Sequence, residues 1–267
     1  MIKHTLLFIL LSSVCWAVDD SVQEWAAYDG FEYRSRLLDG ADGGRGAWLG
    51  YWRPSAEGGV RIETASLDAP FFEVPSQMLR YASIEGQKTA GVYRDLIPLQ
   101  VEVGGSATLW VSFQARVAGA PFDSSGDEAS IHFRGPDNSE LFSIGVMGRL
   151  NEWRVRFNRE STKHFSKGAS EHLPEEAAWV IARIDVNLAT GEEDSITLWT
   201  NPLADVMPSS SSASIVMDFG DIWHAEAPFT LSRIRVGLIN SGSGDSKYFQ
   251  FTDFRFSTNY ESVLKVR

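Results

Sequence analysis

Arginine side chains stand on the outward positions of several segments whose residues alternate as in β-strands. The chain has 18 arginines and six lysines. A guanidinium fork binds a carboxylate or sulfate group, and an indole plane packs on a sugar ring. These residue types on strand faces therefore predict the floor of a groove for an anionic glycan. Eight arginines lie on or beside such positions: Arg116, Arg134, Arg154, Arg156, Arg183, Arg233, Arg235 and Arg255.

Two tryptophans complete the predicted glycan-binding face, because Trp110 and Trp179 alternate in phase with Arg116 and Arg183. The alternative is that the arginines pair across strands with acids such as Asp185 on a solvated sheet. Further aromatics could line a rim or pack in the core: Trp48, Tyr51, Trp52 and Trp223. The predicted ligand-binding residues are Trp110, Arg116, His132, Arg134, Arg154, Arg156, Trp179 and Arg183.

The sequence lacks the residue patterns that are typical of hydrolytic enzymes. A retaining glycosidase needs two carboxylates close together on one strand face, as in an E-x-D-x-x-E run, and the sequence has none. The nearest acidic run, Glu192 to Asp194, falls in a predicted turn. His164 and His172 are spaced too far apart for the H-E-x-x-H pattern of a zinc enzyme. Hydrolase chemistry is therefore disfavoured.

A polysaccharide lyase needs a cation that neutralises a uronate and a histidine or tyrosine that acts as base. His132, Arg134, Arg154 and Arg156 could supply both. The sequence thus leaves enzymatic activity undecided and favours its absence.

These side chains need a large sheet to position them. Residues 178–188 alternate strictly, with one apolar face from Ala178 to Leu188 and one mixed face. No helical period extends beyond two turns, and turn residues separate the segments, which predicts an all-β sandwich in one domain. The clearest predicted strands are residues 107–117, 130–134, 141–147, 153–158, 178–188, 195–199, 230–240 and 248–257.

The first residues and the composition predict an exported protein. Lys3, an apolar run and small residues up to Ala17 form a signal-peptide pattern, with residues 18–267 as the mature chain. The single cysteine, Cys15, lies in that segment, so the mature chain is expected to lack disulfides. A net charge of −11 disfavours nucleic acid as a partner. The mature sequence contains no apolar stretch of membrane-spanning length.

Several blocks resemble the secreted bacterial concanavalin A-like (laminin G-like) jelly-roll domains. They are FEYRSRLLDGADGGRGAWLGYW, SATLWVSFQARV, ELFSIGVMGRLNEWRVRF, EEDSITLWTNP and YFQFTDFRFSTNYESVL, which occur in the expected order. The resemblance implies two packed antiparallel sheets, one of them concave, and glycan binding as a common function. Some branches of the superfamily hydrolyse or eliminate polysaccharides. The resemblance also implies a structural Ca²⁺ between the first and last strands, with Asp29, Glu32 and Asp253 as its oxygen ligands.

Three functions follow from these observations. The favoured one is non-catalytic binding of a polysaccharide, preferably anionic, by an exported β-sandwich. The second is a polysaccharide-active enzyme of the same fold, and the third is a structural or protein-interaction domain without a sugar site. They differ in whether the arginines and aromatics converge on one face of one sheet.

Overall fold

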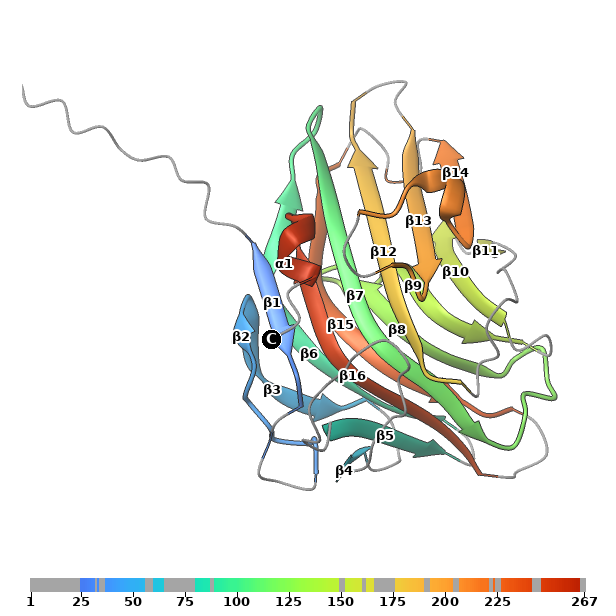
Figure 1. Ribbon diagram of the computed structural model, residues 1–267. Helices are drawn as coiled ribbons and strands as arrows, with labels where there is room; N and C mark the ends of the chain where they lie inside the picture. Colours follow the sequence, from blue (N-terminus) through green and yellow to red (C-terminus); the bar gives the residue numbers. More distant parts are fainter. Residues whose placement is uncertain are drawn as a thin grey trace, which may run out of the picture.

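Two antiparallel β-sheets lie face to face, one in front of the other in Figure 1. The architecture is the predicted all-β sandwich of two antiparallel sheets. This computed structural model describes residues 25–31, 33, 37–55, 60–64, 80–86, 89–148, 152–159, 162–165, 176–189, 193–203, 207–220, 223, 227–241 and 246–264.

Sheet A has nine strands in the order β14-β13-β12-β7-β16-β1-β2, with β5 also pairing β16 and β4 pairing β5. Its strands are β1 (Ala26–Asp29), β2 (Arg45–Gly46), β4 (Val60–Thr64), β5 (Arg80–Gly86), β7 (Ser106–Gly119), β12 (Ala178–Asn187), β13 (Asp194–Thr200), β14 (Ile215–Gly220) and β16 (Lys247–Ser257). A short 3-10 turn, η1 (Ser210–Ser212), precedes β14.

Sheet B has seven strands in the order β11-β10-β9-β8-β15-β6-β3. Its strands are β3 (Trp48–Pro54), β6 (Thr89–Val101), β8 (Glu128–Arg134), β9 (Glu140–Met147), β10 (Glu152–Arg159), β11 (Thr162–Phe165) and β15 (Phe229–Ile239). Among the described residues no helix has the length and apolar character that crossing a membrane requires.

The core lies between the sheets and is formed by the apolar phase of the strands. In sheet A the buried set includes Val180 and Ile184 of β12, as their alternation predicts. In sheet B, Phe133 and Phe142 stack with their ring centroids 4.3 Å apart. Burying a side chain of this size contributes about 1.5–3 kcal/mol, so this alternation fixes which face of each strand turns inward.

A second, smaller apolar cluster lies on the outer face of sheet A, where helix α1 (Tyr260–Leu264) covers it. In Figure 1 this helix lies beside the upper part of β7, near the end of β16. The ring of Tyr260 lies 4.6 Å from that of Trp110, centroid to centroid. This helix was not predicted, because five residues are too few to show a 3.6-residue period. The cluster consists of Trp110, Trp179, Ile181, Trp199, Tyr260 and Val263.

Candidate functional site: the outer face of sheet B

A row of polar side chains crosses sheet B on its outer face, in one register position of six neighbouring strands. Because Ile131 and Phe133 of β8 point into the core, His132 between them points outward. Cross-strand partners of His132 continue the row in both directions. This row, called here the cross-strand row, runs Arg53 (β3), Tyr93 (β6), Arg235 (β15), His132 (β8), Ser143 (β9) and Arg156 (β10).

His132 is held by carboxylates on both sides of its ring. Its Nδ1 lies 2.8 Å from Oε2 of Glu140, and its Nε2 lies 3.3 Å from Oε1 of Glu128. The hydroxyl of Ser130 lies 3.0 Å from the same Nε2 and also donates to Glu128. These contacts fix the orientation of the imidazole, which is only 2% exposed.

Arg156 neutralises the same two carboxylates. It forms a two-pronged ion pair with Glu128, and its Nε donates to Oε1 of Glu140 at 3.0 Å. Burial would raise the pKa of Glu140, but the hydrogen bond from His132 and the charge of Arg156 outweigh it and hold the pKa at about 2. Burial would lower the pKa of Arg156, but Glu128 and Glu140 raise it. The cluster is therefore ionised and internally paired.

Arg235 differs from Arg156 because no carboxylate described by the structure lies within ion-pair distance of it. Its Nε donates to the hydroxyl of Ser55 at 3.1 Å. Burial lowers the pKa of Arg235, the nearby charges of Arg134 and Arg156 lower it further, and Glu128 and Glu140 raise it. A bound anion would offset the repulsion from Arg134 and the loss of hydration that burial imposes on the guanidinium of Arg235. Arg235 is thus a cation at the centre of sheet B without a charge partner among the described residues.

Glycines beside the row give Arg235 and His132 room to lie along the sheet. A Cβ placed on Gly237 would lie 3.5 Å from both Cζ of Arg235 and Nε2 of His132, so the two groups meet over this glycine. By register Gly91 lies on one side of Gly237, and Gly145 lies two strands away on the other. The absence of side chains here leaves the guanidinium and the imidazole as the chemistry-bearing groups of this part of the sheet.

Arg134 and Arg154 complete the positive charge of this outer face. Arg134 donates to the carbonyl of Asn138 at 2.7 Å and lies 3.8 Å from Glu140, and Arg154 pairs with Glu152 at 3.3 Å. The Nε atoms of both arginines are buried and have no hydrogen-bond partner among the described residues. Buried donors of this kind are rare in folded proteins.

The structure divides the predicted ligand-binding residues between two opposite faces. His132, Arg134, Arg154 and Arg156 lie on the outer face of sheet B. The other four belong to β7 and β12 of sheet A: Trp110, Arg116, Trp179 and Arg183. The expectation of one shared groove was therefore wrong, since alternation shows whether a residue points outward but not which sheet its strand joins.

The sheet A members of the predicted set are engaged in structural contacts. Trp110 and Trp179 are 5% and 3% exposed beneath helix α1, which argues against stacking of a sugar on either ring. Arg116 donates to Oε1 of Gln250 at 2.6 Å, and Arg183 pairs with Asp185 at 2.8 Å. Arg116 thus contacts an amide on a neighbouring strand and Arg183 an acid on its own strand, so neither forms the cross-strand ion pair considered as the alternative.

Sequence reasoning missed the residues that organise the sheet B face. Glu128 and Glu140 were not considered, although Glu128 precedes His132 by four residues and therefore shares its face of β8. Arg235 entered only as one of many arginines, and Tyr93 not at all. The period-two spacing from Glu128 to Arg134 was the signal that could have identified the ion-pair cluster.

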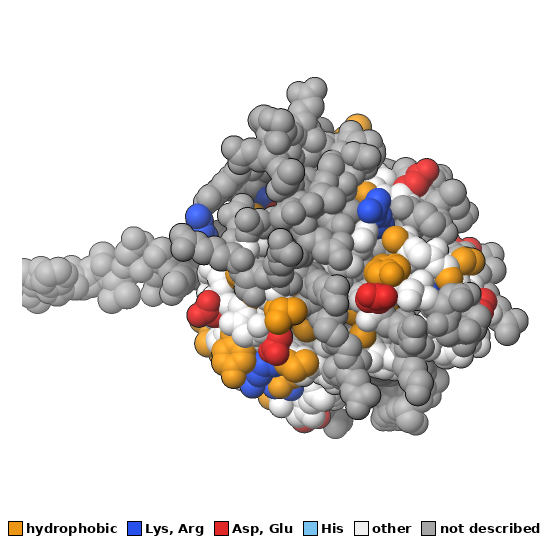
Figure 2. Space-filling view, turned by 90° about the horizontal axis from the view of Figure 1, so that it is seen from below, with side chains coloured by type: hydrophobic (Ala, Val, Ile, Leu, Met, Phe, Trp, Pro, Cys, Tyr) orange, Lys and Arg blue, Asp and Glu red, His pale blue; other side chains and the backbone are white. Residues whose placement is uncertain are grey.

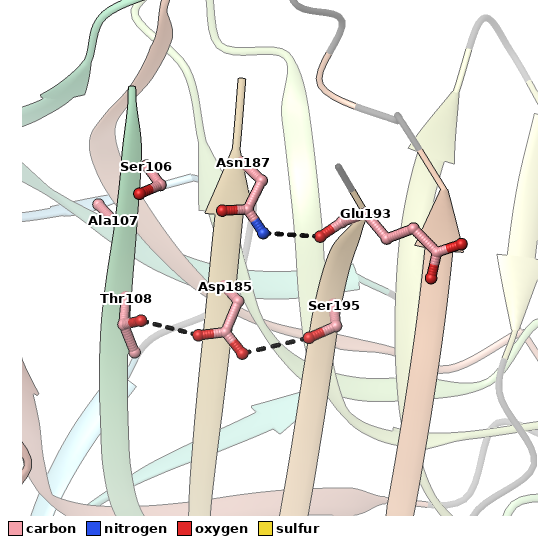
Figure 3. Close-up of a pocket in the computed structure, with 7 residues that line it drawn as sticks. All are labelled: Ser106, Ala107, Thr108, Asp185, Asn187, Glu193 and Ser195. Carbon is pink, nitrogen blue, oxygen red and sulfur yellow. Dashed lines mark hydrogen bonds between the residues drawn. The ribbon is translucent and has the colours of Figure 1, made fainter. Parts of the chain in front are cut away.

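A polar depression of about 360 Å³ lies on the outer face of sheet A and is shown in Figure 3. At its centre, Asp185 accepts hydrogen bonds from Thr108 at 2.7 Å and Ser195 at 3.2 Å, besides its ion pair with Arg183. Asn187 donates to the carbonyl of Glu193. Because these polar groups form hydrogen bonds and an ion pair with one another within the sheet, the depression is a weaker candidate for ligand binding than the region around Arg235.

The described acids do not fit the expected calcium site. Asp29 is buried toward the core, where its carboxylate accepts from Trp52 at 2.9 Å and from Arg94 at 3.1 Å. Burial raises the pKa of Asp29 although these donors lower it. Asp253 pairs with Arg255 on the opposite face of sheet A. Two acids on opposite faces cannot share one ion, and Glu32 lies outside the described residues.

The signal-peptide prediction concerns residues outside the described ones, as do Glu192 and His172, and the side chain of His164 on β11 is not described. Among the described residues no three His, Cys, Asp or Glu side chains are grouped as a metal site would require. Export therefore stays a prediction, whereas one Ca²⁺ shared by Asp29 and Asp253 does not agree with their placement.

Comparison with known proteins gives similarity in structure alone. No family model matches the sequence, and no curated protein matches it. An endo-β-1,4-glucuronan lyase from the fungus Trichoderma reesei is 11% identical, with a TM-score of 0.49, over 88% of this chain and 96% of that one. Lectin II from Ulex europaeus is 9% identical, with a TM-score of 0.44, over 77% and 92%.

The cellulose-induced protein Cip1 is 14% identical, with a TM-score of 0.46, over 78% of this chain and 91% of that one. With identities and TM-scores this low, the similarity assigns neither a substrate nor a site residue to this chain.

Proposed function

We propose that this chain is an exported protein that binds an anionic polysaccharide on the outer face of sheet B. The observation that carries the proposal is Arg235, a partly buried guanidinium without an acid partner among the described residues. A sugar carboxylate is planar and can accept two parallel hydrogen bonds from such a fork. The ligand would supply the negative charge that this position favours.

The fixed cluster beside Arg235 supports binding rather than general surface attraction. Glu128 and Glu140 both pair with Arg156, so the cluster orients the face without adding a large net charge. The whole chain carries −11 and repels a polyanion at long range. Attraction must therefore act at short range, within a Debye length of about 8–10 Å, and moderate salt should weaken it.

The proposal is tested by calorimetric titration with neutral, uronic and sulfated glycans. Arg235→Ala should abolish binding of the uronic polymer, and Arg235→Lys should only weaken it, because lysine keeps the charge and loses the fork. Arg45→Ala is the matched control, since Arg45 is an exposed arginine on β2 of sheet A. Arg183→Ala should also leave binding unchanged. Absence of binding to every glycan, with a folded wild-type protein, would overturn the proposal.

A second candidate function rests on the meeting of His132 and Arg235 over Gly237. A lyase needs a base beside the cation that neutralises the uronate. His132 is the candidate base, and because its Nε2 lies 3.3 Å from Oε1 of Glu128, a substrate would have to displace that contact to reach it. Release of unsaturated sugar products by the wild type, and its loss in His132→Gln with binding retained, would replace the binding function with this one.

A further inference from the structure

The edge of sheet B at β3 exposes apolar side chains next to the cross-strand row. Tyr51 of β3 is 51% exposed, whereas His132 in the row is almost fully buried. Leu49 of β3 and Ile97 of β6 are also exposed. Figure 2 views the molecule from below and shows hydrophobic side chains with basic ones between them at the lower left, the side on which Figure 1 draws β3. This edge thus combines an accessible aromatic ring with cationic groups.

The exposed ring is held by a ladder of cations and aromatic rings. Arg53 Cζ lies 6.0 Å from the ring centroid of Tyr51 and 4.8 Å from that of Tyr93. Arg233 Cζ lies 4.7 Å from the same Tyr93 ring. Both arginines pair with Asp95, which fixes them and neutralises part of their charge. Tyr93 is therefore covered by guanidinium groups, while Tyr51 at the end of the ladder remains accessible.

This edge is continuous with the proposed carboxylate site. Arg53 is the cross-strand partner of Tyr93, and Tyr93 is the partner of Arg235. Neighbouring strands are about 4.8 Å apart, so β3 lies roughly 10 Å from the strand that carries Arg235. One sugar residue on Arg235 cannot also cover Tyr51 at that separation. A chain of sugars that crosses the strands would reach both positions.

We propose that Tyr51, with Arg53 beside it, is a second subsite that stacks a sugar ring of the same uronic-acid polymer. The inference rests on the proposed function, because the carboxylate site at Arg235 anchors the chain. An amphipathic ring next to a cation suits the apolar face and the acidic group of a uronic-acid residue. The protein then recognises chain length as well as charge, and the polymer runs across the strands rather than along them.

The test uses size-fractionated oligosaccharides of polygalacturonate, alginate and glucuronan in calorimetric titrations. Wild-type affinity should rise with oligomer length until both subsites are filled. Tyr51→Ala should weaken binding of the long oligomers by about fivefold to tenfold, about 1.0–1.4 kcal/mol, and leave that of the shortest ones unchanged. Tyr51→Phe keeps the ring and should bind like the wild type. Val216→Ala, a change at an exposed apolar residue of sheet A, is the control.

Equal effects of Tyr51→Ala on short and long oligomers, or no effect on either, would overturn the subsite while leaving the Arg235 site intact. If Arg235→Ala loses binding to oligomers of every length and Tyr51→Ala does not, the result supports Arg235 as the primary site and Tyr51 as the second subsite. A wild type that binds none of these oligomers overturns both proposals together. A wild type whose affinity does not change with length overturns only the second.

Discussion

Glu140→Gln should remove a contribution to stability that depends on pH and comes from the His132–Arg156 cluster. The pKa of Glu140 falls from an ordinary 4.5 to about 2 because His132 and Arg156 stabilise its charge. A carboxyl group whose pKa is lower in the folded state stabilises that state above the unfolded pKa, and this effect is lost as the pH falls through the folded pKa. The difference corresponds to about 3 kcal/mol near neutral pH, of which about 2 kcal/mol is lost by about pH 3.

Urea denaturation of the wild type and the variant at about pH 6 and about pH 3 measures this effect. The free energy of unfolding of the wild type, minus that of Glu140→Gln, should shrink by about 2 kcal/mol between the two conditions. Glu193→Gln is the control, because Glu193 is an exposed carboxylate outside the cluster. It reports what removal of a surface charge does by itself.

An energy difference that stays constant between the two pH values would refute the reasoning. It would mean that the cluster does not hold Glu140 ionised more strongly than the unfolded chain does. A difference that changes as it does for the control would have the same meaning. In either case the paired network around His132 would not be the fixed element on which the proposed site depends.

Other perturbations test separate parts of the structure. Lys247→Met should destabilise the fold by about 3–5 kcal/mol, measured by urea denaturation, because it leaves the buried Asp127 without its cation; a loss below about 1 kcal/mol would contradict this ion-pair role. Gly145→Ala should lower the melting temperature and reduce the free energy of unfolding by roughly 1–3 kcal/mol, because a Cβ there would lie 2.2 Å from the carbonyl oxygen of Ala129. An unchanged melting temperature would show that β8 and β9 can move apart enough to accept the methyl group, and would contradict this prediction. Chelator should leave the melting temperature unchanged, because Asp29 and Asp253 face opposite sides of sheet A; a clear decrease would restore the calcium prediction.

The sequence predicted the fold because strand alternation is a local signal. Val180 and Ile184 turn inward as their spacing predicts, and the strand around His132 was placed within two residues of its observed start. Helix α1 was missed because its stability comes from packing on Trp110 rather than from its own short sequence. That contact also buried a tryptophan that had been expected to bind sugar.

The site was only half predictable, for a reason of topology. The spacing within one strand could have linked Glu128 to His132, but the contacts of Arg156 with Glu128 and Glu140 join three strands that become neighbours only in the folded sheet. The same limit separated Arg183, in sheet A, from Arg235, in sheet B, although both looked alike in the sequence. Which sheet a strand joins, and which strands become its neighbours, depends on the strand order, and the local sequence does not encode that order.

The most direct test of the account is a crystal structure of the protein soaked with a uronic-acid oligosaccharide. The account predicts sugar density on the outer face of sheet B, with a carboxylate within hydrogen-bonding distance of the Arg235 guanidinium. Density on the outer face of sheet A, at the depression around Asp185, would contradict it. So would sugar bound to sheet B with its carboxylates directed away from Arg235.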